Sequence, residues 1–147
     1  MLIKKFFEEI TFLGGVLFYS IFLLYFLLEQ KYIYFGILLT SLILVYFVTF
    51  LIRIFYFKTR PEKVKYNNFL EKIDASAFPS IHAARVFILF LFFISFINNF
   101  YFFFLFLLFV LFLTIYSRIY LRKHDIVDVF GGLILGTISF FVSFLIW

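Results

Sequence analysis

Both histidines of the chain lie in short polar clusters that separate long apolar runs. The second, His124, is followed four residues later by Asp128. Residues at i and i+4 share one face of a helix, so this carboxylate can accept an imidazole N–H, fix the tautomer and stabilise the charged ring. The other ring nitrogen is then free to attack phosphorus. The spacing therefore predicts a nucleophilic histidine backed by a carboxylate.

Cationic and hydroxyl groups in the same polar clusters could hold a phosphate. Arg53, Arg60 and Arg118 carry planar guanidinium forks, which make strong charge-assisted hydrogen bonds to phosphate oxygens. Ser80 stands at the start of an expected helix, where its hydroxyl and the free backbone N–H groups form an anion site. His82, just inside that helix, could protonate a leaving oxygen. These groups predict phosphoryl transfer that needs no metal and no cofactor.

Composition indicates that membrane helices must position these residues. Of 147 residues, 66% are hydrophobic and 14% are charged, whereas soluble domains average about 45–50% apolar and about 25% charged. The absence of cysteine excludes disulfides and thiolate metal sites. The net charge of +5 could suggest nucleic acid, but the basic residues sit in short breaks between apolar runs. Lipid head groups or a phosphate-bearing substrate are favoured as partners, and nucleic acid is not.

Five apolar runs are long enough to span a bilayer, which takes about 20 residues per helix. They are expected at residues 10–28, 32–52, 80–97, 100–116 and 125–147. The breaks between them include a long polar stretch at 58–74, a turn at 98–99 and a short basic break at 117–123. The predicted fold is all-α: a polytopic membrane bundle of about five transmembrane helices plus a short N-terminal interfacial helix over residues 1–9, forming one domain over 1–147.

Alternating spans bring the helix ends that carry the polar clusters to one membrane face. The second span ends at Arg53, the third begins at Ser80, the fourth ends at Ser117 and the fifth begins near His124. Most lysines fall on this face, with Lys31 nearly alone opposite. The positive-inside rule therefore favours a cytoplasmic site in an integral, multi-pass membrane protein, although substrate-binding charges enter the same count.

Each of these residues also has a structural interpretation. A lone histidine near a helix end is usually an interfacial polar residue, an arginine there commonly anchors topology, and an aspartate there commonly caps the helix. Gly131, Gly132 and Gly136 on the last span favour close helix packing. The combination favours chemistry, because S-R-x5-H-x3-D alone is expected in about one chain per thousand of this length at roughly 5% residue usage.

Taken in order, these clusters resemble the three signature motifs of the type 2 phosphatidic acid phosphatase (PAP2) superfamily, K-x6-R-P, P-S-G-H and S-R-x5-H-x3-D. The resemblance spans residues 53–136, and the third motif matches at every fixed position. It implies His124 as the phosphate-attacking nucleophile with Asp128 as its partner, and His82 as general acid. It also implies the phosphate ligands Arg53, Arg60, Ser80 and Arg118.

The chain departs from the family pattern at two motif positions. Arg53 stands where the family usually has lysine, which keeps the charge but alters its reach. Ile81 replaces the glycine that lets backbone approach the phosphate, and could narrow the pocket or change the substrate. The first of the family's usual six spans is missing or reduced to residues 1–9.

Residues 76–85 and 117–136 look most like the small polyisoprenoid and presqualene diphosphate phosphatases. Those relatives also carry an arginine three residues after the second-motif histidine, here Arg85. Arg85 faces the same side as His82 and could contact a second phosphate. The alternative is that it pairs with an acid such as Asp125.

The sequence thus predicts a metal-independent membrane lipid phosphatase that acts on a lipid phosphate or diphosphate, either a polyprenyl diphosphate or a phosphatidate, through a phosphohistidine at His124. Two alternatives remain: a lipid phosphotransferase with the same intermediate, and a catalytically silent lipid-binding membrane protein. The intact His82, His124 and Asp128 argue against the silent protein. A haloperoxidase is least favoured.

Overall fold

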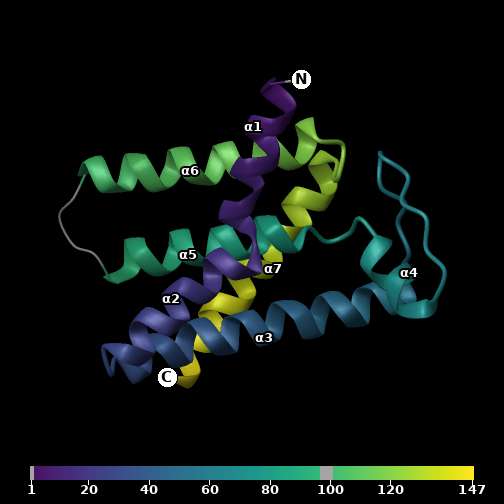
Figure 1. Ribbon diagram of the computed structural model, residues 1–147. Coiled ribbons are helices and arrows are strands. Elements are labelled where there is room, and N and C mark those ends of the chain that lie inside the picture. The colour runs from purple at the N-terminus through teal and green to yellow at the C-terminus, as the bar shows by residue number, and fades with distance from the viewer. Residues whose placement is uncertain (1, 97–100) are drawn as a thin grey trace.

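A computed structural model describes residues 2–96 and 101–147, and every regular element in those residues is a helix (Figure 1). The elements are α1 (Leu2–Ile10), the 3-10 helix η1 (Thr11–Gly14), α2 (Val16–Leu28), α3 (Tyr32–Phe55), α4 (Phe69–Ala75), α5 (Ile81–Phe96), α6 (Tyr101–Tyr120) and α7 (Ile126–Ile146).

Within the described residues, four helical segments are long and apolar enough to cross a membrane: Leu2–Leu28, α3, α6 and α7. The apolar helix α5 has 16 residues and so reaches only about 24 Å at 1.5 Å per residue. The predicted all-α membrane bundle is confirmed. The predicted turn at 98–99, the end of the third span and the start of the fourth lie outside the described residues.

The first predicted run is not one straight helix. η1 ends at Gly14, and Gly15 is extended, with φ −73° and ψ 157°, so α2 begins only at Val16. Two consecutive glycines weaken a helix at this point. α1 is a separate helix whose Phe7 ring packs against Tyr116 and Tyr120 of α6. The placement of α1 in the membrane interface stays a prediction.

α6 extends beyond residue 116, where the fourth span was predicted to end. α6 continues to Tyr120, so Ser117 and Arg118 lie inside a helix and not in a break. No glycine or proline interrupts residues 117–120, so the helix can continue through them. The helix ends where Arg122 adopts a left-handed φ of 54° and the Arg118 carbonyl accepts the Lys123 N–H, an arrangement typical of helix C-termini.

The polar stretch between α3 and α5 contains a helix, α4, that was not predicted. Asn68 caps α4, because its side-chain oxygen accepts the Glu71 N–H at 2.8 Å. Glu71 in turn accepts the Asn67 N–H at 2.7 Å. The pattern N-x-x-E is a helix-start signature, so the signal was present in the sequence.

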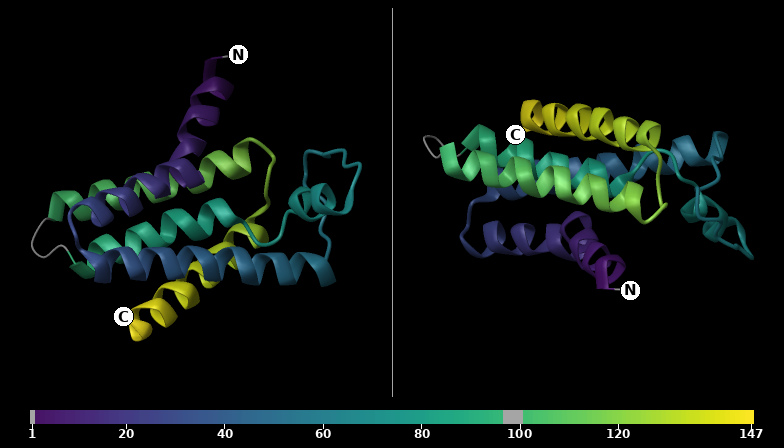
Figure 2. Two further views of the ribbon diagram at one scale, coloured as in Figure 1. Left: turned by 60° about the horizontal axis from the view of Figure 1, so that its bottom comes forward. Right: turned by 90° about the horizontal axis from the view of Figure 1, so that it is seen from above.

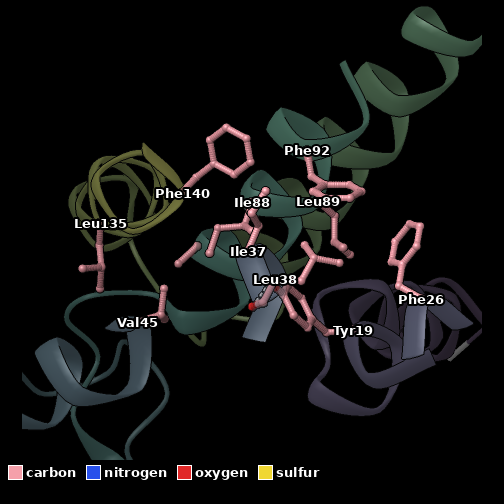
Figure 3. Close-up of a cluster of buried hydrophobic side chains, with 11 residues drawn as sticks. Tyr19, Phe26, Ile37, Leu38, Val45, Ile88, Leu89, Phe92, Leu135 and Phe140 are labelled. Carbon is pink, nitrogen blue, oxygen red and sulfur yellow. Dashed lines mark hydrogen bonds between the residues drawn. The ribbon is translucent and has the colours of Figure 1, made fainter. Parts of the chain in front are cut away.

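α5 and α7 pack closely because small residues meet between them. A Cβ on Gly136 would lie 2.8 Å from the Ala84 carbonyl oxygen, and one on Gly132 would overlap the Ser80 carbonyl oxygen. These contacts agree with the close-packing interpretation of the glycines. Side chains of α2, α3, α5 and α7 form the apolar core beside this contact (Figure 3), including the fully buried Tyr19, Leu38 and Ile88.

The C-terminal end of α3, the N-terminal end of α5, the C-terminal end of α6 and the N-terminal end of α7 point to one end of the bundle (Figures 1 and 2). α4 lies at the same end. The N–H of Ser80, just before α5, donates to the Asp128 carbonyl of α7 at 2.9 Å. Segments that are far apart in the sequence therefore meet at one end, as the alternating spans predict.

Candidate active site

A cavity of about 280 Å³ opens where these helix ends meet. Both histidines and four of the five arginines of the chain contribute to its wall. The lining residues are Tyr46, Arg53, Arg60, Asp74, Ile81, His82, Arg85, Arg118 and His124. The structure thus brings seven of these side chains, predicted from three separate motifs and their flanks, into one polar chamber.

His124 and Asp128 are both buried, with exposed fractions of 2% and 0%. His124 lies in the turn before α7 and not on the helix itself, because Asp125 is the N-cap. Its Nδ1 is 3.7 Å from Asp128 Oδ2. That separation is within ion-pair range but longer than a hydrogen bond. Since Nδ1 faces the carboxylate, Nε2 is the nitrogen left for a substrate.

The surroundings of His124 favour the neutral ring. Burial lowers its pKa below the ordinary value, and Asp128 opposes this shift without overcoming it. The guanidinium groups of Arg118 and Arg60 lower the pKa further. A neutral imidazole has the free lone pair that a nucleophile needs.

The Asp128 carboxylate has two partners besides His124. Its Oδ2 accepts the Asp125 N–H at 2.9 Å, while Asp125 Oδ1 accepts the Asp128 N–H at 3.0 Å, which is a reciprocal capping box. Lys58 Nζ donates to Asp128 Oδ1 at 2.7 Å and to Asp125 Oδ2 at 2.6 Å. Burial acts to lower the pKa of Lys58, but the two carboxylates outweigh it and raise that pKa. Lys58 is therefore a charged clamp on both acids.

Lys58 was not among the predicted site residues. Two acids at a helix start, Asp125 and Asp128, require a counter-charge when one of them is fully buried. The two neighbouring acids can be seen in the sequence, but the burial of Asp128 cannot. The sequence also does not indicate why Lys58 pairs with these acids and the other lysines of the polar stretch do not. That pairing depends on how the loop between α3 and α4 folds back.

Ser80 lies outside the wall of the cavity. Its hydroxyl accepts the Ala83 N–H at 3.4 Å and its backbone N–H is bonded to α7, so it holds the start of α5 against that helix. Its predicted contact with phosphate stays a prediction. Ile81, at the position of the family glycine, lines the cavity, and its effect on the width of the pocket stays a prediction.

Arg53 directs its guanidinium to backbone carbonyls. Nε donates to Phe78, Nη1 to Ile73 and Asp74, and Nη2 to Pro79, at 3.1–3.4 Å. The residue is 5% exposed and holds α4 and the segment that leads to α5 against the end of α3. Arg53 thus has a structural role that the motif spacing did not predict, next to its place on the cavity wall.

Three other arginines keep buried donors unpaired. Within the described part of the chain, the Nε atoms of Arg60, Arg85 and Arg118 have no hydrogen-bond partner. A buried, unsatisfied N–H is costly, and such groups in a native fold call for an explanation. Since all three residues line one cavity, an anion bound there would supply the missing acceptors.

The same arginines are oriented by residues that the motifs do not include. Arg85 Nη1 donates to the Tyr46 hydroxyl at 2.7 Å, so the alternative pairing with Asp125 is not formed. Arg118 Nη1 donates to the Thr11 hydroxyl at 3.1 Å. Tyr46 and Thr11 lie in apolar runs where one polar residue per turn is unremarkable, so no local signal identifies them.

Comparisons with known proteins agree with the motifs and the fold. A sequence profile described as the PAP2 superfamily matches residues 34–147. The crystal structure of LpxE from Aquifex aeolicus is similar over 98% of this chain and 86% of that chain, with a TM-score of 0.75 and 23% sequence identity. No curated protein sequence matches the chain.

Proposed function

The chain belongs to the PAP2 superfamily, and from this premise we propose that it is a membrane lipid phosphatase whose catalytic residues are His124, Asp128 and His82. The observation that carries the proposal is the cavity that joins both histidines to three arginines with unpaired, buried Nε donors. Such a chamber, set in a bundle of apolar helices, fits a phosphate attached to a lipid.

In the first step of the proposed reaction, the lone pair of His124 Nε2 attacks the phosphorus and forms a phosphohistidine. The bond between phosphorus and the lipid oxygen breaks, and its electron pair leaves with that oxygen. His82 donates a proton to the oxygen, so the product is the lipid alcohol. Asp128 stabilises the positive charge that develops on the His124 ring.

In the second step, water attacks the phosphorus while the neutral His82 takes a proton from it. The phosphorus–nitrogen bond breaks and its electron pair returns to Nε2, which releases inorganic phosphate and restores both rings. Arg60, Arg85 and Arg118 hold the phosphate oxygens throughout. The bound phosphate also brings negative charge among these cations, which favours the protonated His82 that the first step requires.

The test is phosphate release from a lipid phosphate in bilayer vesicles, measured in the presence of a metal chelator. The wild-type protein should release phosphate, and His124→Ala should abolish turnover. His82→Ala should slow it by about 10²–10⁴-fold, the usual contribution of a general acid. Asp128→Asn should reduce turnover while the protein remains in the membrane. Equal rates of phosphate release by the wild type and by His124→Ala would contradict the mechanism.

Two further measurements complete this test. A rapid-quench experiment with labelled lipid phosphate should trap an acid-labile phosphoryl group on the wild type and none on His124→Ala. Product analysis in the presence of alcohols distinguishes hydrolysis from transfer. Free phosphate as the main product supports the phosphatase, and a phosphorylated alcohol as the main product would make the protein a phosphotransferase.

A further inference from the structure

We call the cavity lined by His82, His124 and the arginines the phosphate chamber, after its proposed ligand. A second cavity lies beside it, and its lining residues are all apolar. Its volume is about 590 Å³, and all of its lining residues are Ile, Leu, Val or Phe, with seven phenylalanines among fourteen residues. They come from the last residue of α1, Ile10, and from η1, α2, α5 and α6. A wall of apolar side chains suits a hydrocarbon, since a polar ligand group there would lose its hydrogen bonds to water.

Helix α5 leads directly from one cavity to the other. His82 and Arg85 line the phosphate chamber, and the next residue, Val86, lines the apolar cavity together with Leu89 and Phe93. Positions 82, 86, 89 and 93 form one stripe of a helix. A ligand whose phosphate lies at the arginines therefore has its tail beside the apolar cavity.

η1 forms the other junction between the two cavities. Thr11 accepts a hydrogen bond from Arg118 of the phosphate chamber, whereas Leu13 lines the apolar cavity. Gly14 packs against α5, because a Cβ added to it would lie 3.1 Å from the Cβ of His82. The outer wall includes Phe106 and Phe109, which are 58% and 63% exposed and so face lipid. A hydrocarbon chain can thus reach the cavity from the bilayer.

The volume indicates how many chains the cavity holds. A 150 Å³ apolar cavity takes one benzene ring, so at the same packing 590 Å³ holds roughly 24 carbon atoms. One long chain fits this space, while the two acyl chains of a diacyl lipid together exceed it. We propose that this cavity binds the single hydrocarbon chain of the substrate, so that the enzyme prefers one-chain lipid phosphates to diacyl ones. The inference rests on the proposed phosphatase function.

The experiment compares substrates that share a head group and differ in the number of chains. Wild-type protein in nanodiscs is given lysophosphatidate, phosphatidate and the chain-free ester p-nitrophenyl phosphate. We expect kcat/KM for lysophosphatidate to exceed that for phosphatidate by about tenfold or more, the scale on which apolar pockets discriminate. Equal efficiency for the two lipids would overturn the proposal.

Filling the cavity provides the second arm. Leu107→Trp, in the cavity wall, should lower kcat/KM for lysophosphatidate by about tenfold and leave p-nitrophenyl phosphate hydrolysis unchanged. Leu105→Trp is the matched control, because Leu105 lies on the same helix outside the wall and should alter neither reaction. Should Leu107→Trp fail to fold, the smaller change Val110→Phe tests the same wall. If a folded variant keeps the wild-type ratio of kcat/KM for lysophosphatidate to kcat/KM for p-nitrophenyl phosphate, the proposal is overturned.

A labelling arm separates failure of the inference from failure of the proposed function. A lysophosphatidate analogue with a photoreactive group in its chain should label the α5 and α6 residues of the cavity wall, and Leu107→Trp should block this labelling. Labelling spread evenly over the lipid-facing helices would show that only bulk lipid fills the cavity, and would overturn the proposal. Absence of hydrolysis with every ester would overturn the phosphatase function, while the labelling result would still test the cavity.

Discussion

At the scale of single residues, the Asp128 carboxylate is shared among groups with different demands. One oxygen accepts from Lys58, and the other accepts from the capping N–H of Asp125 and faces His124 at 3.7 Å. A carboxylate held by a lysine attracts an imidazolium less strongly than a free one would. Burial is the main reason that the pKa of His124 is lowered, and the sharing of Asp128 limits how far that carboxylate can oppose the shift. The neutral ring suits the proposed nucleophile, and the carboxylate still leaves negative charge beside it for the proposed intermediate.

The first prediction concerns the pH dependence of the reaction. Because the pKa of His124 is lowered, the acid limb of kcat/KM should lie below the ordinary histidine value of about 6.5. Lys58→Met removes a cation and frees Asp128 for His124, and both effects raise the pKa of His124. The acid limb should therefore move to higher pH. The measurement is kcat/KM against pH for p-nitrophenyl phosphate.

Lys123→Met is the control for this prediction. Lys123 pairs with Glu62 at 2.5 Å and forms no ion pair with Asp125 or Asp128, and the lysine holds the pKa of Glu62 below its usual range. Neither group lines the phosphate chamber. The profile of this variant should match the wild type, and a Lys58→Met profile that also matches it would show that Asp128 is not divided between Lys58 and His124.

The second prediction concerns Ile81, which occupies the family's glycine position on the cavity wall. Ile81→Gly should enlarge the chamber beside His82 and Arg85. We expect the ratio of kcat/KM for farnesyl diphosphate to that for farnesyl monophosphate to rise, because the larger phosphate group gains space. Rates for the two substrates measured in parallel check this, and Ile88→Val, in the core outside the chamber, should leave the ratio unchanged.

At the scale of elements, the contact between α5 and α7 sets the geometry of the site. Ser80 at the start of α5 is bonded to the Asp128 carbonyl, and Gly132 one turn further along α7 touches the Ser80 carbonyl. Asp128 and His82, the proposed partner of the nucleophile and the proposed general acid, are thus held by one interface of small residues. Small shifts between these two helices would separate His82 from His124.

The third prediction uses two adjacent glycines of α7. Gly132→Ala would press a methyl group against the Ser80 backbone, which cannot move without α5, whereas Gly131→Ala meets only the outer edge of the Phe78 ring. We expect Gly132→Ala to cost about 1–3 kcal/mol in stability and to reduce turnover strongly. Gly131→Ala should cost less in both. Thermal unfolding and phosphate release, measured on both variants, check the difference.

At the scale of the whole molecule, the bundle gathers its basic residues at the end that carries the phosphate chamber. Lys4, from the N-terminal helix, shares a surface depression with Pro61, Glu62 and Arg122. The N-terminus thus lies near the polar loops of the site, as the alternating spans predict. Lys31 lies in the turn between α2 and α3, at the other end of the bundle.

The fourth prediction is the sidedness of the site. We propose, from the distribution of positive charge, that the chamber opens on the cytoplasmic side. The chain has no cysteine, so single cysteines report without background. Lys65→Cys should react with a membrane-impermeant maleimide only in inside-out vesicles. Lys31→Cys should react only in right-side-out vesicles. The reverse pattern would place the chamber outside the cytoplasm.

The sequence by itself determined the membrane class, the helical architecture and most of the cavity wall. Apolar composition and the length of the apolar runs decide directly whether helices can span the hydrocarbon core of a bilayer. The third motif also fixes the neighbourhood of His124 and Asp128, because a four-residue separation across a helix start leaves few alternatives. These features could be predicted because each depends on residues that are close in sequence.

Only the tertiary structure decided which distant groups pair. It assigned Lys58 to the two acids, Tyr46 to Arg85 and Thr11 to Arg118, and it turned Arg53 toward backbone carbonyls. Ser80 was placed behind the cavity wall. Each of these outcomes depends on how the helices pack and on how a polar loop folds back over them. The spacing of residues along the chain does not indicate such contacts, because they join side chains that are far apart in sequence.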